Sequence, residues 1–161
     1  MQLVQRLKSN DRGRDFIVGD LHGCLEDLHR LMNHVNFDSA QDRLLSVGDM
    51  TDRGPDSPGC LRLLDETWFY AVVGNHERMF ADYLMSIDPD TEWESSGAMD
   101  LFLYNGGDWA TEDPTVYWDQ RQQLIQNLRA LPLILSVETP DDGIFHVAHG
   151  DLMFDKDSIM K

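Results

Sequence analysis

Residues 48–54 read Gly48-Asp49-Met50-Thr51-Asp52-Arg53-Gly54, follow the apolar run 44–47, and lead into a helix that we predict near Pro58. The stretch therefore places two carboxylates and one guanidinium at the end of a strand. One carboxylate can bridge two cations, the second can orient an acid or a base, and the arginine can hold a phosphate through two parallel hydrogen bonds. Taken alone, the same residues fit an Asp/Gly-rich turn with a solvated arginine equally well.

The same order of strand, polar turn and helix occurs before and after this stretch. The apolar run 16–18 precedes Gly19-Asp20-Leu21-His22-Gly23, and a helix is predicted over 25–35 because apolar residues recur there at helical spacing. The run 69–73 precedes Gly74-Asn75-His76-Glu77 and a further helix. Since the carboxyl ends of parallel strands meet at one edge of a sheet, we expect these polar turns to lie side by side, where open α/β sheets bind ligands.

The last part of the chain predicts one more helix and a hairpin. A helix is expected over 120–130, and apolar strands over 131–137 and 144–148 flank the turn Thr139-Pro140-Asp141-Asp142-Gly143. The second of these strands ends at His149, which brings another imidazole to a strand end. This side chain is therefore a further candidate metal ligand.

The segment 86–119 is acidic and loop-rich, and is predicted to pack as a helical cap over the sheet. Its tryptophans are expected to pack this cap or, near a cleft, to touch substrate: Trp93, Trp109 and Trp118. The remaining histidines are interpreted as structural: His29 and His34 on the surface or at the end of a helix, and His146 packed in a strand or at a sheet edge.

Composition limits the class of protein. A chain of 161 residues without internal repeats predicts one domain over 1–161, because this length buries roughly two-thirds of the unfolded surface. Thirteen Lys and Arg against 29 Asp and Glu give a net charge of −16, which argues against a nucleic-acid partner. No apolar run is long enough for a membrane span or a signal peptide, so we expect no membrane partner. Cys24 and Cys60 are expected to be reduced packing residues of a cytoplasmic protein.

Three of these motifs occur in a fixed order: Gly-Asp-Leu-His-Gly at 19–23, Gly-Asp-x-x-Asp-Arg-Gly at 48–54 and Gly-Asn-His-Glu at 74–77. Together they resemble the metallophosphoesterases of the PPP serine/threonine phosphatase type. Asn-Gly-Gly-Asp-Trp at 105–109, Leu-Pro-Leu at 131–133 and Ala-His-Gly-Asp at 148–151 resemble the bacterial and bacteriophage branch, typified by the bacteriophage lambda protein phosphatase. The resemblance implies an α/β fold, the calcineurin-like metallophosphoesterase α/β/β/α sandwich with mixed sheets.

The resemblance also implies two divalent metal ions, with manganese expected and iron, zinc, nickel or cobalt as alternatives. Asp20 and His22 would hold the first ion. Asn75 and His149 would hold the second, and Asp49 would bridge the two. A hydroxide bridging the ions would attack the phosphorus atom directly.

The remaining roles follow from the same resemblance. Arg53 would hold the phosphate oxygens, and His76, oriented by Asp52, would protonate the leaving alkoxide as a general acid. The implied activity is hydrolysis of phosphomonoesters on serine or threonine, with tyrosine as a further target. The implied partner is therefore a phosphoprotein or a small phosphoester.

Three departures from the family pattern modify these expectations. Val73 stands where the bacterial branch carries an arginine, which removes one phosphate contact. A further histidine of the second metal, in a downstream Gly-His-Thr segment, has no counterpart, so the second site is expected to be incomplete. The closing strands of the sandwich would lie beyond Lys161, so we expect a C-terminally truncated domain whose uncovered sheet edge allows self-association.

Two alternatives to the protein phosphatase remain open. One is a dinucleoside polyphosphate hydrolase, although the related motif set usually lacks the aspartate found here at Asp52. The other is a truncated, inactive remnant that still binds metal and acts, if at all, as an interaction module.

Overall fold

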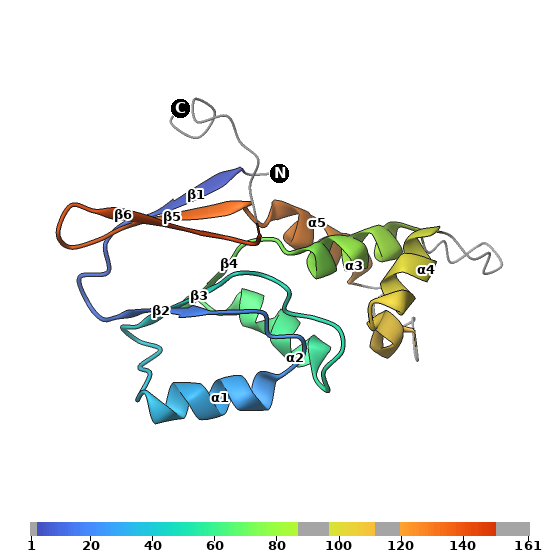
Figure 1. The fold of residues 1–161 in the computed structure, drawn as a ribbon, viewed down its shortest axis with the longest axis horizontal. Helices are drawn as coiled ribbons and strands as arrows, with labels where there is room; N and C mark the ends of the chain where they lie inside the picture. The colour runs from blue at the N-terminus through green and yellow to red at the C-terminus, as the bar shows by residue number, and fades with distance from the viewer. Residues whose placement is uncertain (1–2, 87–96, 112–119, 151–161) are drawn as a thin grey trace.

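The computed structural model describes residues 3–86, 97–111 and 120–150. Three parallel strands form the lower sheet in Figure 1, in the order β2 (Asp15–Val18), β3 (Arg43–Ser46) and β4 (Phe69–Ala71). This confirms the predicted parallel strands. The central strand β3 is buried on both faces, since Leu44 is 4% exposed and Leu45 is 0% exposed, as is typical of strands in parallel sheets.

The apolar run 16–18 predicts a buried strand; it does form β2, but this strand is only partly buried. β2 lies at one end of the sheet order β2-β3-β4, and Ile17 on it is 57% exposed. Its register partner Leu45 contributes to the core between the sheets. An edge strand has a neighbour on one side only, which leaves Ile17 at the margin of that core.

A second sheet lies above the first, in the order β1 (Val4–Leu7), β5 (Ile134–Glu138) and β6 (Ile144–Ala148) (Figure 1). β5 and β6 form the predicted antiparallel hairpin, whose turn is closed by Thr139 N donating to Gly143 O at 2.9 Å. β1 was not predicted, because Gln5 and Arg6 interrupt its apolar pattern. It forms by pairing in parallel with β5.

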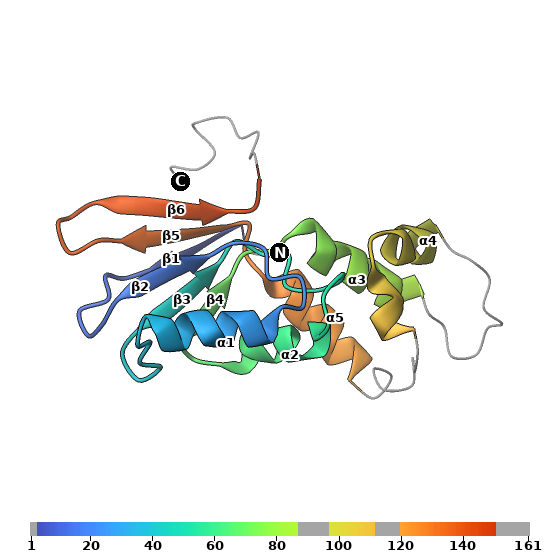
Figure 2. The ribbon, with the colours of Figure 1, turned by 60° about the horizontal axis from the view of Figure 1, so that its bottom comes forward.

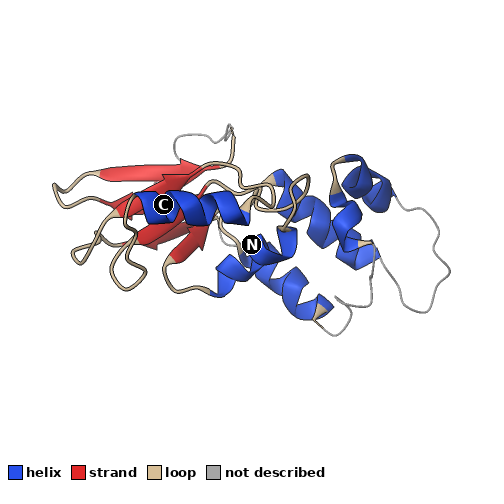
Figure 3. Ribbon diagram, turned by 90° about the horizontal axis from the view of Figure 1, so that it is seen from below, coloured by secondary structure: helices blue, strands red, loops and turns tan. Residues whose placement is uncertain are grey.

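Two helices cover the lower face of the lower sheet, namely α1 (Leu25–His34) and α2 (Ser57–Arg62) (Figures 1 and 3). The helix predicted near Pro58 ends at Arg62, and the chain continues as a 3-10 turn, η1 (Leu63–Asp65). Asp56 caps α2 by accepting from Gly59 N at 2.7 Å. Leu28, Cys60 and Leu63 pack from this layer against β3 and β4.

Three further helices lie beyond the carboxyl ends of the lower strands: α3 (Asn75–Ser86), α4 (Gly97–Tyr104) and α5 (Arg121–Ala130) (Figure 2). Together with the 3-10 turn η2 (Gly107–Ala110), they form what we call the helical unit. Its core is aromatic, with Tyr83 and Phe102 rings 4.7 Å apart. The described part of the predicted cap does not lie over the sheet, because α4 packs against α3 beside the sheets (Figure 2). Trp93 and Trp118 lie outside the described residues.

The described elements form three layers: the helices α1 and α2, the parallel lower sheet and the mixed upper sheet. The helical unit lies alongside these layers (Figure 1). The second helical layer of the expected four-layer sandwich is not found among the described residues. No helix in the described part of the chain is long and apolar enough to span a membrane. Both cysteines are free thiols, and burial raises the pKa of Cys60 to about 12, consistent with packing residues.

Candidate metal centre

The predicted site residues come together at the carboxyl ends of four strands. Asp20 and His22 follow β2, Asp49 follows β3, and His149 follows β6, which runs in the same direction as β2 (Figure 2). Asn75 and His76 differ slightly from the prediction, because they form the first turn of α3 and not a turn before it. The first two segments are joined by backbone hydrogen bonds from Leu21 N and His22 N to Asp49 O.

Several of these residues adopt backbone conformations that side chains other than glycine rarely take. The φ angles are 43° for His22, 50° for Asp49, and 72° for both Asp52 and Arg53. Each such residue costs about 1–2 kcal/mol, so the surrounding hydrogen bonds must hold them. Strained residues of this kind cluster at functional sites.

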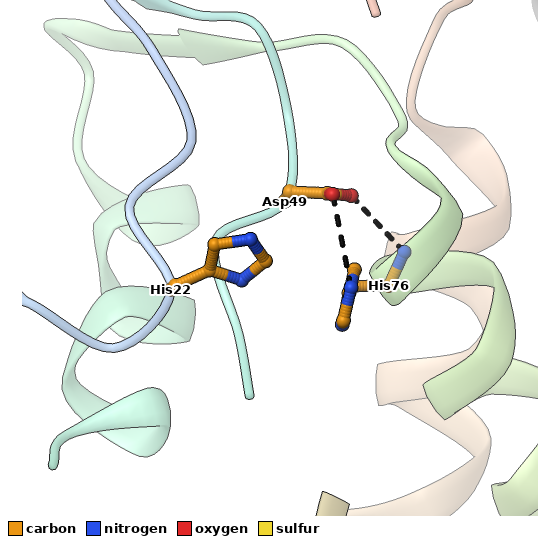
Figure 4. A group of neighbouring side chains, drawn as sticks. All are labelled: His22, Asp49 and His76. Atoms are coloured by element: carbon orange, nitrogen blue, oxygen red, sulfur yellow. Dashed lines mark hydrogen bonds and ion pairs between the residues drawn. The ribbon is translucent and has the colours of Figure 1, made fainter. Parts of the chain in front are cut away.

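Asp49 occupies the centre of the site and is 4% exposed. Its Oδ1 accepts from His76 N at 3.1 Å, and its Oδ2 lies 3.9 Å from His76 Nε2 (Figure 4). The same Oδ2 lies 3.4 Å from His149 Nε2. Two groups of side chains with metal-ligand spacing share this carboxylate among the described residues. One is His22, Asp49 and His76, and the other is Asp20, Asp49 and His149.

The first group differs from the predicted set Asp20, His22 and Asp49. Arg53 Nη1 lies 2.9 Å from His22 Nε2 and Arg53 Nη2 lies 3.0 Å from His76 Nε2, which brings the two imidazoles together. Their ring centroids are 4.7 Å apart. Asp20 Oδ2 remains 3.9 Å from His22 Nε2, so it lies near both groups.

The histidines are oriented in a way that suits metal binding. His22 Nδ1 lies 2.9 Å from Thr51 O, and His149 Nδ1 lies 2.9 Å from Val47 O. Because a carbonyl oxygen only accepts, each Nδ1 carries a proton. His22 Nε2 accepts from Arg53 Nη1 at 2.9 Å and so keeps its lone pair. Both Nε2 atoms face carboxylate or amide oxygens, and His149 Nε2 lies 3.0 Å from Asn75 Oδ1. This donor set of imidazoles and oxygens fits divalent transition-metal ions.

His76 and Asp52 form a buried pair beside this centre. His76 Nδ1 lies 2.6 Å from Asp52 Oδ2, and both side chains are 0% exposed. Burial raises the pKa of Asp52, while hydrogen bonds from Trp109 and His76 oppose this shift. A carboxylate held this way can fix an imidazole and stabilise its charged form.

Two residues near the centre, Glu77 and Trp109, make contacts that the sequence did not predict. Glu77 is 0% exposed, and its carboxylate accepts from Asp49 N at 2.9 Å, Met50 N at 2.7 Å and Gly74 N at 2.8 Å. Burial raises the pKa of Glu77. Trp109 Nε1 donates to Asp52 Oδ1 at 2.6 Å. Both lie in motifs noted in the sequence, but only the structure shows which atoms they hold.

Glycine is required where the loops come close together. A Cβ atom on Gly74 would collide with the Asp49 carboxylate, and one on Gly54 would collide with His22 O. These two glycines therefore let the polar segments approach one another. His29, His34 and His146 lie at exposed positions, with His146 on the edge strand β6. Asp151, the last residue of the Ala-His-Gly-Asp motif at 148–151, lies outside the described residues.

Comparison with known proteins places this geometry in context. Residues 16–158 match the family described as calcineurin-like phosphoesterase. The chain is 40% identical over 150 residues to serine/threonine-protein phosphatase 1 of Salmonella typhimurium, covering 93% of this chain and 64% of the relative. It is 34% identical to the symmetrical bis(5'-nucleosyl)-tetraphosphatase of Proteus mirabilis, over 69% of this chain and 39% of that protein.

A solved structure has a similar fold. A crystal structure described as a candidate diadenosine tetraphosphatase superposes with a TM-score of 0.67 at 30% identity, covering 98% of this chain and 59% of that one. The chain therefore spans less than two-thirds of the length of the relatives it matches first.

Proposed function

The chain belongs to the calcineurin-like phosphoesterase family, and on that premise we propose that it is a metal-dependent phosphatase of phosphoserine and phosphothreonine side chains in proteins. The family hydrolyses phosphoesters with divalent metals, and the proposal concerns which residues act and on which substrate. Phosphotyrosine is included as a further target. Manganese is the proposed ion, because the donors combine imidazole nitrogen with carboxylate and amide oxygen.

One observation carries the proposal. His22 and His149 both have Nδ1 held by a backbone carbonyl, and both turn Nε2 toward the oxygens around the shared carboxylate of Asp49. We assign Asp20, His22 and Asp49 to one ion, and Asp49, Asn75 and His149 to the second. Bound divalent ions supply Lewis acidity and lower the pKa of water so that it attacks at neutral pH.

Arg53 is the proposed phosphate ligand. Its exposed guanidinium reaches both His22 and His76 with separate nitrogens, at 2.9 and 3.0 Å. A phosphate group offers two oxygens at the spacing that such a fork prefers. Substrate would therefore replace the imidazoles as acceptors, which leaves His22 Nε2 for an ion and His76 Nε2 for the leaving group.

His76 is the proposed general acid. With Nδ1 bound to Asp52, only Nε2 can deliver a proton to the departing oxygen. The bond between phosphorus and the serine or threonine oxygen breaks, the water oxygen bonds to phosphorus, and the departing alkoxide takes the proton from Nε2. The buried carboxylate of Asp52 stabilises the charged imidazole before this transfer.

The substrate class follows from the relatives and from one residue. Support for a phosphoprotein comes from the 40% identity to a bacterial enzyme named as a serine/threonine-protein phosphatase, and from the presence of Asp52. The second candidate is dinucleoside polyphosphate hydrolysis, favoured by the structural likeness at a TM-score of 0.67. The predictions of cytoplasmic location and of self-association remain predictions from the sequence.

The test compares substrates at equal manganese concentration. We expect inorganic phosphate to be released from a phosphoserine peptide much faster than nucleotide is released from diadenosine tetraphosphate. Cleavage of the dinucleotide alone would favour the second candidate. Manganese binding without cleavage of either substrate would favour the inert metal-binding protein.

A further inference from the structure

Trp109 joins the helical unit to the buried pair of Asp52 and His76. Its indole Nε1 donates to Asp52 Oδ1 at 2.6 Å, and the other oxygen of the same carboxylate, Oδ2, lies 2.6 Å from His76 Nδ1. Asp52 is 0% exposed, so bulk solvent does not compete with either partner. Each oxygen of this carboxylate therefore has its own donor, and the donor on Oδ1 comes from a separate part of the fold.

The indole ring is itself held in place. The Trp109 ring centroid lies 5.0 Å from that of Phe80 and 6.2 Å from that of Phe102. Phe80 belongs to α3, and Phe102 belongs to α4. Gly107, at the start of η2, packs so closely on Phe102 that a Cβ atom would collide with its ring. The aromatic core of the helical unit thus sets the position of the indole N–H.

The same segment contacts the next residue of the metal-centre loop. Arg53 N donates to Gly106 O at 3.3 Å, and a Cβ atom on Gly106 would lie 3.0 Å from Arg53 N. Asp52 and Arg53 both have φ of 72°, a conformation that these residues do not favour. Residues 106–109 therefore contact both members of a strained pair.

We propose that Trp109 is a positioning residue for the general acid, acting through Asp52. The indole N–H fixes the rotation of the Asp52 carboxylate, so that Oδ2 faces His76 Nδ1 and the imidazole directs Nε2 toward the leaving oxygen. The inference rests on the proposed function for the role of His76. The structural claim, that Trp109 positions the Asp52 carboxylate for its hydrogen bond to His76, depends only on the contacts described above.

Loss of the indole donor has a clear physical consequence. A buried carboxylate oxygen without a donor is unfavourable, so the carboxylate would rotate or take up a proton. Either change weakens its hydrogen bond to His76 Nδ1. Burial raises the pKa of Asp52, and the hydrogen bond from Trp109 lowers it. Loss of this hydrogen bond would therefore favour the protonated carboxyl group.

The kinetic test uses Trp109→Phe, which removes the N–H and keeps an aromatic ring. We expect kcat on a phosphoserine peptide to fall about 10-fold to 100-fold, the loss typical of one hydrogen bond to a charged group. Turnover of p-nitrophenyl phosphate should stay within about 3-fold, because its leaving group needs no proton. The matched control is Trp68→Phe, since the Trp68 ring packs on Phe37 and Phe69 away from the site.

A second measurement does not depend on activity. In metal-free protein labelled with nitrogen-15 at histidine, the His76 Nδ1 proton should give a far-downfield resonance, assigned by its loss in His76→Asn. The resonance should move upfield or broaden in Trp109→Phe and stay unchanged in Trp68→Phe. Replacing the Trp109 indole by its benzothiophene isostere, which keeps the shape and lacks the N–H, should have the same effect as Trp109→Phe.

The outcomes separate the inference from the proposed function. An unchanged His76 resonance in the isostere variant would overturn the positioning role, whatever the activity of the protein. Equal losses on both substrates in Trp109→Phe would also contradict it, because a merely structural role would slow both. If the wild-type chain hydrolyses neither substrate, the proposed function fails while the resonance still tests the contact.

Discussion

His76 Nδ1 lies 2.6 Å from Asp52 Oδ2, and neither side chain is exposed to solvent. A buried imidazole with a carboxylate on one nitrogen can act only through the other nitrogen. In this protein, the other nitrogen lies 3.0 Å from Arg53 Nη2, which is the proposed phosphate ligand. The proposed acid His76 and the proposed phosphate ligand Arg53 are therefore adjacent in the folded chain.

The first prediction follows from this pair. His76→Asn should slow hydrolysis of a phosphoserine peptide by about 10²–10⁴-fold, because the departing alkoxide then lacks a proton donor. The rate on p-nitrophenyl phosphate should fall much less. Parallel stopped-time assays on the two substrates measure the difference, and equal losses would show that His76 is not the acid.

The second prediction concerns the shared carboxylate. Asp49→Asn should weaken manganese binding more than any other single change, because Asp49 belongs to both groups with metal-ligand spacing. Titration calorimetry of wild-type and variant chains gives the affinities. Asp27→Asn, an exposed change on α1 where the side chain pairs with Arg30 at 3.2 Å, is the control. Equal losses in the two variants would contradict the assignment.

The third prediction concerns Glu77, whose carboxylate accepts from three backbone N–H groups around Asp49. Glu77→Gln places an amide N–H against at least one of these donors, and should cost about 1–3 kcal/mol of unfolding free energy. Manganese affinity should fall as well, because the loop that carries Asp49 loses its support. Urea unfolding and calorimetry check the two effects.

Asp82→Asn is the matched control for that change, since Asp82 lies on the exposed side of the same helix. It should leave both unfolding free energy and manganese affinity unchanged. Glu77→Gln with wild-type affinity would mean that the Asp49 loop holds its conformation without this carboxylate.

The fourth prediction concerns pH and a structural ion pair. Arg14 lies 2.6 Å from Asp42 and, with its hydrogen bond, holds the pKa of Asp42 at about 2. The unfolded carboxyl titrates near ~3.9, so the stabilisation is complete above that pH and is lost as pH falls toward about 2. Asp42→Asn should therefore destabilise the protein at pH ~7 by about 1–3 kcal/mol, and the difference should shrink below pH ~4.

Urea unfolding at several pH values measures this difference. Glu138→Gln is the control, because the Lys8–Glu138 pair is solvent-exposed and such pairs contribute little. A constant gap between wild type and Asp42→Asn across the acidic range would contradict the assignment of Asp42.

The meeting of the polar turns could be predicted from the sequence, because parallel strands deliver their carboxyl ends to one edge. Asp20, Asp49 and Asn75 each lie just after the end of a parallel strand. In the structure they lie around the same centre as His149. His149 required the additional hairpin, which the turn 139–143 also indicated. The metal and catalytic roles of these residues remain predictions that the experiments above address.

Other features depend on contacts between segments distant in sequence, which the local sequence pattern does not predict. β1 has only four residues and forms because β5 offers a free edge. The exposure of Ile17 depends on which strand lies at the edge of the sheet. The link from Trp109 to Asp52 joins residues far apart in the chain, so no spacing rule could find it.

The most direct test of the account is manganese-dependent phosphate release from a phosphoserine peptide by the wild-type chain and by Asp49→Asn. We expect phosphate release by the wild-type chain to rise with manganese concentration and to stop when a chelator is added. In Asp49→Asn, we expect it to be lost. Release that persists in the chelator, or that is equal in the Asp49→Asn variant, would contradict a metal centre built on Asp49.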